Sequence, residues 1–351
     1  MERGSCEKAK LCTAAPEPFR RHDGGMVWDI RAERCENMAK RAKKTRQKQK
    51  ITLKQIIKQK ELILISIPFV IYGIIFYYVP LAGWVMAFQN YKPKYGLWES
   101  PFVGLQKFER LFSDPNFIKV IRNTLCMGII NLVLSFFFSI LFAILLNEVR
   151  IRSAKKFVQT VSYLPHFLSW IIVTGIVHDV LSLENGIINQ VLVALHILEK
   201  PINWFAYPKY FWWIVGFSNV WKETGWGSII YLSAITSISP DLYEAAAMDG
   251  AGRLRKIWHI TLPGIKPTIF ILLLINIGNV LNAGFEVQYL LGNGLVQSVS
   301  QTIDIYVLKW GISQGDYSLG TAAGIFKSLV SIILIWLANS AAKAAGEERM
   351  F

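Results

Sequence analysis

The sequence predicts an all-α, polytopic membrane protein with six transmembrane helices. Of its 351 residues, 53% are hydrophobic, and its mean hydropathy is positive. Six mostly apolar runs each reach the length of about 20 residues that a transmembrane helix needs. Soluble domains of this size do not usually string together so many such runs. Segments rich in Lys and Arg follow several of the runs, as is typical of the cytoplasmic loops of membrane proteins.

The chain before the first run is polar and strongly basic. Residues 1–37 mix Pro, Gly, Cys and charges without apolar periodicity, so we expect disorder there. The basic stretch that begins at Met38 is more typical of the start of such a protein, so we expect translation to begin at Met38 and not at Met1. Residues 40–60 hold ten Lys and Arg side chains and no acid. A basic block directly before a span is typical of a topology signal and of lipid-headgroup contact, so we do not expect nucleic-acid binding despite the net charge of +14.

The expected organisation is a tail over 1–50, a transmembrane domain over 51–342 and a cytoplasmic tail over 343–351. Residues 51–60 are read either as a short interfacial helix or as an extension of the first span. Pro68 is expected to kink the first span, which neighbouring helices can tolerate. The six predicted spans are 62–88, 117–146, 157–180, 211–235, 268–291 and 319–338.

The charges of the loops predict that both termini are cytoplasmic. The basic block at 40–60 dominates this prediction, and the loops expected inside carry further cations. The loops expected outside, 91–115 and 181–210, are longer and hold acids as well as cations, and a short external helix is expected over 303–310. The cations of the inside loops are Arg150, Arg152, Lys155, Lys156, Arg253, Arg255 and Lys256.

A polar segment between the fourth and fifth predicted spans stands out from the apolar chain. Residues 242–247 are good helix formers, and Asp241 after Pro240 is the predicted N-cap. Gly250 and Gly252 permit a helix stop and a sharp turn. We therefore expect a short helix across the cytoplasmic mouth of the protein, whose alanines let another protein approach closely. The alternative is an ordinary basic loop.

The same segment resembles a family signature, that of permease subunits of binding-protein-dependent ABC importers. Trp258 stands where the family usually has Phe. The resemblance implies a type I importer architecture, in which this loop is a coupling helix that fits a groove of a cytoplasmic ATPase. Glu244 would anchor the helix by a cap or salt bridge, and Asp249 and Gly250 would shape the turn. The matching residues are Glu244, Ala245, Ala246, Asp249, Gly250, Ala251, Ile260, Leu262, Pro263 and Pro267.

Two further stretches, 159–167 and 316–324, resemble carbohydrate-type permeases of ABC importers, most closely the subgroup that handles oligosaccharides and polysaccharide fragments. The similarity extends from about residue 50 to the end, although Lys107 replaces the Asn usual in one weaker motif. This resemblance implies a bacterial plasma-membrane protein that pairs with a second permease, with ATPase subunits and with an external solute-binding protein, and that imports a sugar.

Polar side chains recur on one face of each of two predicted spans. Such groups are costly in a membrane and usually face a cavity or a partner. Amides, acids and cations can bond to sugar hydroxyls, and an aromatic ring can pack on a pyranose. We predict that both faces line the substrate pathway; helix–helix bonding, including a Lys222–Glu286 pair, is the alternative. The residues are Asn219, Lys222, Glu223 and Trp226 in the fourth span and Asn276, Asn279, Asn282 and Glu286 in the fifth.

Two charged or titratable residues in other spans have open roles. His166 is read as a hydrogen-bonded structural residue, because no partner His, Cys or carboxylate lies near it in sequence. Lys327 either faces an acidic sugar, reaches the interface or pairs internally.

Enzyme function is not expected. The sequence has no phosphate-binding G-x-x-x-x-G-K-[ST] loop, so ATP hydrolysis would fall to partner subunits. Its four cysteines show no metal or disulfide spacing, no catalytic cluster stands out, and no cofactor or metal is expected. The alternative functions are import of peptides or amino acids by the same class of transporter, or ion-driven transport without an ATPase.

Overall fold

A computed structural model describes residues 59–344 of the chain. The predictions for the tail before residue 59, including the start at Met38 and the interfacial helix over 51–58, lie outside the described residues, as does the segment after 344. Within 59–344 the protein is built from helices and contains no β-strand, apart from one isolated bridge between Gln89 and Phe102. The all-α prediction is therefore confirmed for this part of the chain.

The described chain falls into two units, one ending at Tyr78 and the other beginning at Val79. The first contains α4 (Lys60–Gly73) and a π-helical turn, η1 (Ile74–Tyr78). Pro68 lies inside α4, and no residue of α4 is buried. Tyr72 packs on Phe76 with ring centroids 4.7 Å apart. An apolar helix that buries none of its surface in its own chain suits a lipid or protein environment.

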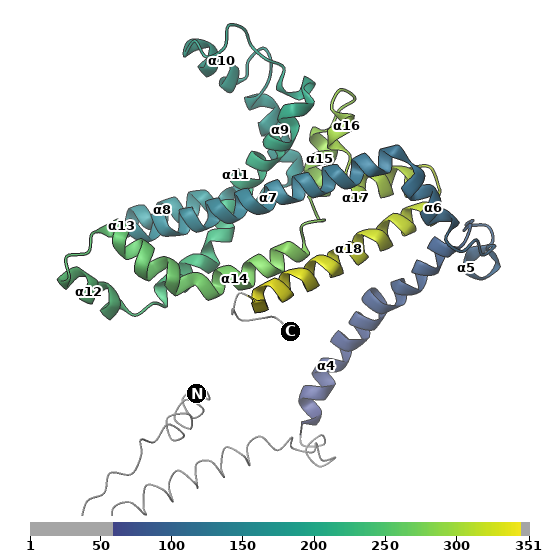
Figure 1. The fold of residues 1–351 in the computed structure, drawn as a ribbon, viewed down its shortest axis with the longest axis horizontal. Helices are drawn as coiled ribbons and strands as arrows, with labels where there is room; N and C mark the ends of the chain where they lie inside the picture. The colour runs from purple at the N-terminus through teal and green to yellow at the C-terminus, as the bar shows by residue number, and fades with distance from the viewer. Residues whose placement is uncertain (1–58, 345–351) are drawn as a thin grey trace, which may run out of the picture. The chain divides into compact units, whose positions relative to one another are not determined.

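The second unit holds the remaining helices, and long helices dominate it (Figure 1). Its elements are η2 (Val79–Phe88), α5 (Gly96–Glu99), α6 (Gln106–Ser113), α7 (Pro115–Glu148), α8 (Arg152–Tyr163), η3 (Leu164–Phe167), α9 (Trp170–Val180), α10 (Ile187–Ala194), η4 (Trp204–Ala206), α11 (Pro208–Thr236), α12 (Pro240–Met248), α13 (Arg253–Lys256), η5 (Ile257–Thr261), α14 (Leu262–Gly278), α15 (Phe285–Leu291), α16 (Gln297–Ser300), α17 (Ile303–Tyr306), η6 (Val307–Ser313) and α18 (Tyr317–Ala344).

Four helical segments of the described chain are long and apolar enough to cross a membrane, and a bent pair makes up to five. The six predicted spans are thus found only in part. The 211–235 span lies within α11, which has the length but is less apolar, since Lys222, Glu223 and several hydroxyl groups interrupt it. The four segments are Lys60–Phe88, Pro115–Glu148, Arg253–Gly278 and Tyr317–Ala344.

Two predicted spans are broken. The 157–180 span bends by 105° between Arg152–Phe167 and Trp170–Val180, around the 3-10 turn that contains Pro165. The side chain of Ser169 caps the second part of this bend. The 268–291 span was predicted as continuous, and that is wrong: α14 ends at Gly278 and α15 begins only after Gly284, whose φ of +89° favours glycine.

The long helices α7 and α11 pack against each other, and α14 and α18 pack together beside them. Close approach depends on glycine. A Cβ on Gly225 of α11 would lie 2.0 Å from the backbone oxygen of Ser162 in α8, and one on Gly128 of α7 would lie 2.0 Å from that of Val280. Small residues at helix crossings are typical of membrane proteins, where backbone proximity replaces the hydrophobic effect.

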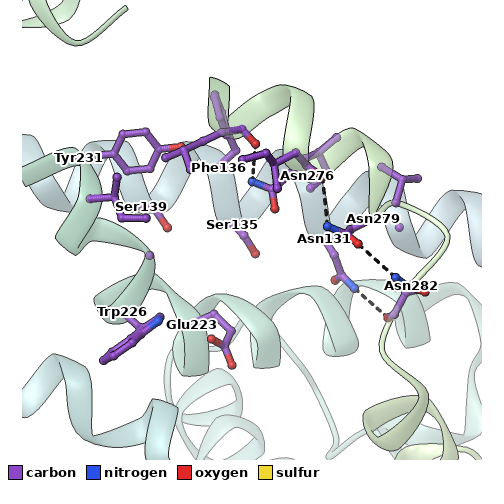
Figure 2. Close-up of a pocket in the computed structure, with 18 residues that line it drawn as sticks. Asn131, Ser135, Phe136, Ser139, Glu223, Trp226, Tyr231, Asn276, Asn279 and Asn282 are labelled. Carbon is purple, nitrogen blue, oxygen red and sulfur yellow. Dashed lines mark hydrogen bonds between the residues drawn. The ribbon is translucent and has the colours of Figure 1, made fainter. Parts of the chain in front are cut away.

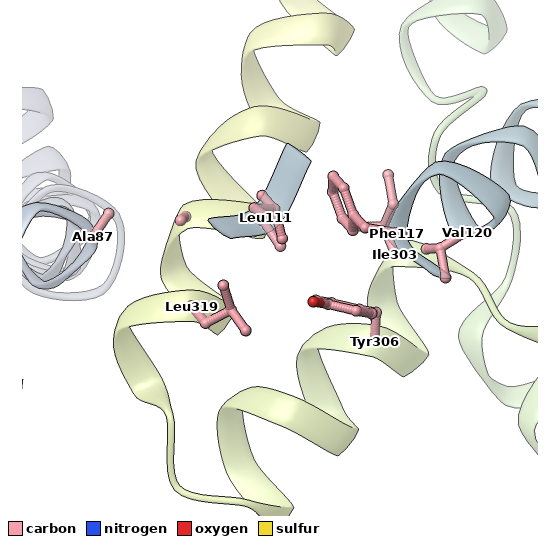
Figure 3. Packing of buried hydrophobic residues seen from close by; sticks show 9 residues of the cluster. Ala87, Leu111, Phe117, Val120, Ile303, Tyr306 and Leu319 are labelled. Atoms are coloured by element: carbon pink, nitrogen blue, oxygen red, sulfur yellow. The ribbon is translucent and has the colours of Figure 1, made fainter. Parts of the chain in front are cut away.

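A buried cluster joins η2, α6, α7, α17 and α18 (Figure 3). Phe117 packs on Tyr306 with ring centroids 5.1 Å apart. Burial, reinforced by the nearby Asp114 carboxylate, raises the pKa of Tyr306, so the phenol stays neutral and donates to Asp114 Oδ2 at 3.3 Å. Asp114 also caps α7 by accepting from the Asn116 amide at 2.9 Å. This cluster therefore fixes the start of α7 against the last third of the chain.

Candidate functional site

The predicted coupling segment forms a short helix, α12, at the end of the second unit where the labels of α8 and α13 also stand in Figure 1. The predicted N-cap was wrong: Ser239, not Asp241, caps α12, and its hydroxyl accepts from the Asp241 amide at 3.3 Å. Pro240 follows the cap at the first helical position.

The helix ends in a Schellman motif. The amide of Ala251 bonds to the oxygen of Ala246 at 2.8 Å, and that of Gly250 to the oxygen of Ala247 at 3.1 Å. Gly250 has a φ of +75°, and no neighbour lies within 4 Å of the position its Cβ would take. Glycine is thus required at 250 by backbone conformation and not by space. Asp249 is the C-cap residue.

The α12 helix buries no residue in its own chain. Met248 is 90% exposed and Leu254, just beyond the turn, is 82% exposed. Glu244 is exposed and makes no side-chain hydrogen bond or ion pair within residues 59–344, so the predicted cap or salt bridge is not found there. The Tyr243 hydroxyl lies 3.0 Å from Thr261 Oγ1 and ties α12 to the following helix.

We call α12 together with its terminal turn at Gly250 the foot. The other predicted coupling residues lie in the foot or in the next long helix, α14. Ala245 is exposed and Ala246 half-buried on α12. Leu262 and Pro263 form the first turn of α14, and Pro267 lies inside that helix. Leu262 packs against the buried cluster that joins α7, α11 and α14.

A polar pocket of about 430 Å³ lies between α7, α11 and α14. Five of the eight predicted pathway residues line it: Glu223, Trp226, Asn276, Asn279 and Asn282. Figure 2 shows Glu223 and Trp226 on one wall and the three asparagines on the facing wall. The structure thus brings together polar groups of two predicted spans, within a bundle whose outer surface is apolar.

The asparagine wall surrounds the break after α14. Asn276 Nδ2 donates to the oxygen of Leu272 at 2.8 Å, so its own side-chain oxygen can accept a bond from the pocket. Asn282 Nδ2 donates to Asn279 Oδ1 at 3.2 Å. On the facing helix, Asn131 Nδ2 donates to the oxygen of Ala283 at 3.2 Å and holds the non-helical segment against α7 (Figure 2).

On the opposite wall, Glu223 and Trp226 belong to a connected group of four residues, whose other two members, His166 and Lys222, lie behind the pocket lining. His166 Nδ1 lies 2.7 Å from Glu223 Oε2, and the His166 ring stacks on Trp226 with centroids 4.5 Å apart and planes 2° apart. Lys222 Nζ donates to the oxygen of His166 at 2.6 Å and lies 3.2 Å from Glu223 Oε1. The prediction that His166 is hydrogen-bonded is confirmed; its partner is a carboxylate 57 residues away in the chain.

Three predicted pathway residues lie outside this pocket. Lys222 is buried and, with Glu286, lines a second cavity of about 470 Å³. The predicted Lys222–Glu286 pair is not found; Lys222 pairs with its neighbour Glu223 instead. Consecutive helical residues point about 100° apart, which is why Lys222 and Glu223 face different cavities. Asn219 lines neither cavity.

Two lysines with open roles are paired within the chain. Lys327 Nζ lies 2.6 Å from Asp304 Oδ1, so of the three roles open for it the internal pair is found. Lys107, at the position where the weaker motif usually has Asn, is buried and lies 3.0 Å from Asp316 Oδ1. Arg110 also reaches Asp316, at 3.1 Å.

Sequence reasoning missed the α7 side of the pocket. Asn131, Ser135 and Ser139 line it, and their spacing of four puts them on one helical face. That spacing was available in the sequence but is weak, because hydroxyl groups are common in membrane helices. Among the described residues no group of three or more His, Cys, Asp or Glu side chains could hold a metal ion.

Comparisons with known proteins place this arrangement in context. A family model described as "Binding-protein-dependent transport system inner membrane component" matches residues 135–345. The polygalacturonan/rhamnogalacturonan transport system permease protein YteP of Bacillus subtilis is 46% identical, over 87% of this chain and 95% of its own length. Protein LplB of the same organism is 43% identical, over 84% and 92%.

A solved structure also matches. The chain superposes with a TM-score of 0.76 and 37% identity on a chain of a bacterial ABC transporter involved in the import of the acidic polysaccharide alginate. The match covers 83% of this chain and 98% of that one. A second structure of such a transporter, in complex with a periplasmic protein bound to an alginate pentasaccharide, gives a TM-score of 0.77.

Proposed function

Because the chain belongs to the family of binding-protein-dependent transport system inner membrane components, we propose that it is the sugar-conducting permease subunit of an ATP-driven ABC importer. The observation that carries the proposal is the pocket between α7, α11 and α14, where amides face a carboxylate and an indole in an otherwise mostly apolar lining. The identity to sugar permeases over most of the chain supports it.

The pocket's chemistry suits a polyhydroxylated solute. Its amides both donate and accept hydrogen bonds, as sugar hydroxyls do. Trp226 is 46% exposed and offers an indole for the apolar face of a pyranose, while the stacked His166 holds that indole in place. Each exposed polar contact contributes little, on the order of 1 kcal/mol. Weak binding is what transport needs, since the solute must leave again.

The α12 end is proposed as the contact with the ATPase. An exposed helix with a rigid turn and outward apolar side chains, Met248 and Leu254, is a suitable partner surface. Arg253 and Lys256 follow α12 in the chain, and Arg150 lies just before α8, so by the positive-inside rule we assign this end, and both termini, to the cytoplasm.

The full transporter would contain partners. The family is a transport component and not a catalytic subunit, so ATP hydrolysis is assigned to separate ATPase subunits. A second permease would complete the pathway, and an external binding protein would deliver an oligosaccharide related to polygalacturonan or rhamnogalacturonan, the substrates in the name of the 46% identical relative.

The test is uptake by the complete transporter in proteoliposomes with its binding protein and ATP. We expect ATP-dependent accumulation of labelled trigalacturonate but not of a labelled tripeptide. Trp226→Ala, which removes the indole, should slow sugar uptake about 5- to 10-fold, corresponding to roughly 1–1.5 kcal/mol of stacking. Trp98→Ala, at an indole that is 96% exposed and lines none of the described pockets, is the control. Uptake without the ATPase, or of the tripeptide alone, would refute the proposal.

A further inference from the structure

A third hollow, a cleft with a partly polar lining, is formed by residues of α7, α16 and η6 together with Gln301. Its α7 residues, Asn116 to Asn123, lie in the first turns of that helix. Its volume is about 270 Å³. Ligand pockets commonly measure about 300–1,000 Å³, so the cleft has room for a small group and not for a whole chain of sugars. In the proposed orientation it opens on the outer side of the membrane.

The cleft is cationic. Lys119 from α7 and Lys309 from η6 line it, and no Asp or Glu does. Neither ammonium group has a hydrogen-bond or ion-pair partner within residues 59–344. Lys107 and Lys327 differ from them, because each is paired with an aspartate of the same chain. The chain neutralises those two lysines internally and leaves the two of the cleft available for an external anion.

The walls of the cleft are held in place. Asn123 Nδ2 donates to the oxygens of Ser298 and Gln301, at 3.0 and 3.2 Å, and so joins α7 to both ends of α16. Trp212 Nε1 donates to the oxygen of Val299 at 3.0 Å and fixes the other side of α16. A site with fixed walls binds without a large ordering cost.

Asp114 and Asp316 lie next to lining residues of the cleft without lining it, and Asp316 is paired with Lys107 and Arg110. Asp114 caps the first turn of α7 and accepts from the Tyr306 hydroxyl, so its oxygens are already engaged. On the other side, the Arg122 guanidinium donates to Asn123 Oδ1 at 3.0 Å and adds positive charge beside the wall. Of the residues that line the cleft, only Lys119 and Lys309 carry charge.

We infer that this cleft binds a carboxylate-bearing unit of an acidic oligosaccharide, at the outer end of the pathway. Two ammonium groups match the carboxylate of a uronic acid, Gln297 and Gln301 match its hydroxyls, and the Trp310 indole matches the apolar face of its ring. An acidic side chain of a docking protein would use the lysines but would not need an indole inside a recess. The inference rests on the proposed sugar-import function and names its substrate class.

The test compares an acidic sugar with a neutral one of the same skeleton. Proteoliposomes with the complete transporter and saturating, preloaded binding protein are given trigalacturonate or its methyl ester. The double variant Lys119→Gln/Lys309→Gln should lower the ratio of acidic to neutral uptake about 2- to 20-fold, the sum of two partly exposed ion pairs. Lys119→Glu should lower it further by repulsion.

Two controls fix the interpretation. The variant Lys92→Gln/Lys200→Gln removes the same charge from other exposed positions expected outside and should leave the ratio unchanged. Lys119→Arg/Lys309→Arg should preserve it. Three results would overturn the inference while leaving sugar import intact. They are an unchanged ratio of acidic to neutral uptake in the Lys119→Gln/Lys309→Gln variant, an equal loss of uptake for both sugars, and uptake of the ester alone by the wild type. Uptake of neither sugar by the wild type would instead refute the proposed function.

Discussion

Gly250 offers a direct test of the foot, because its neighbour Gly252 provides a matched control. Gly250 has a φ of +75°, whereas Gly252 has a φ of −70° and a ψ of 171°. No atom lies within 4 Å of the position that a Cβ would take at either residue. At position 250 the Cβ of a valine would therefore have room, but the residue would have a strained backbone conformation. At position 252 the Cβ would also have room, and the backbone conformation is an ordinary one.

The free-energy cost of valine at position 250 follows from its left-handed backbone conformation. The left-handed region costs an ordinary residue about 1–2 kcal/mol, and a β-branched residue meets at least the upper value. A penalty of that size lowers the population of the native turn about 5- to 30-fold relative to its alternatives. The alternatives lose the bonds from Gly250 and Ala251 to the last turn of α12, so the end of α12 and the start of the next helix change direction.

The assay measures coupling and assembly separately. The complete transporter in proteoliposomes is assayed for ATP hydrolysis stimulated by loaded binding protein, and for sugar taken up per ATP. Gly250→Val should lower both about 5- to 30-fold with normal amounts of transporter in the membrane, and Gly252→Val should lower neither. Gly250→Asn should fall between them, because Asn tolerates this conformation better than other residues.

Equal behaviour of the two valine variants would refute the reasoning, because then the local conformation at 250 does not control the foot. Loss of the Gly250→Val transporter from the membrane would assign the glycine to folding and not to coupling. Either result would leave the pocket argument untouched.

Three further predictions concern packing and charge. Gly225→Ala should destabilise the purified protein by about 1–3 kcal/mol, because its Cβ would lie 2.0 Å from a backbone oxygen of α8; Gly175→Ala, with nothing within 4 Å, is the thermal-unfolding control. Asp316→Asn should lower the melting temperature by several degrees, since it leaves Lys107, 11% exposed, without its carboxylate; an unchanged melting temperature would contradict the pairing. His166→Phe should keep the ring stack but lose about 1 kcal/mol of bonding to the α11 carboxylate, and so slow uptake several-fold; uptake at the wild-type rate would exclude it from the wall.

The foot was predictable because its information is local. Gly250, Pro240 and the alanine run fix a helix and its stop by their own conformational preferences. The N-cap was misjudged by two residues, since Ser239 and Asp241 are both good caps and only the backbone decides between them. The exposure of the foot followed from its polarity and needed no knowledge of the rest of the fold.

The broken spans were not predictable from apolar runs. In a membrane both the lipid-facing and the packed surfaces are apolar, so the run over 268–291 gave no sign of its interruption except Gly284 and the asparagines before it. The three asparagines do line one pocket, but only Asn276 lies inside a helix. Asn282 reaches the pocket from the non-helical segment between α14 and α15. Glu286 lies in α15 and lines another cavity, because helical spacing does not continue across the break.

Contacts between polar side chains that are far apart in the chain could not be predicted, for a different reason. His166 and Glu223 are 57 residues apart, and each is an isolated polar residue in its own run. Only the bend of the third predicted span, at Pro165, turns His166 toward α11. A single sequence carries no signal for which of several intramembrane polar groups will meet.

The connection between the foot and the pocket is short in the chain and rigid in structure. The wall with Glu223 and Trp226 belongs to α11, which ends at Thr236, and α12 begins at Pro240. On the other side α13, the π-helical η5 and α14 follow one another from Arg253 to Gly278, 26 residues or roughly 39 Å at the α-helical rise, and Asn276 lies near the far end. The foot is therefore the link between the two walls of the pocket. A rotation of α12 by a gripping partner would tilt the second helix against α11 and widen or narrow the pocket, while the non-helical residues after Gly278 absorb the change. We propose that this helix transmits a movement of the turn at Gly250 to the pocket.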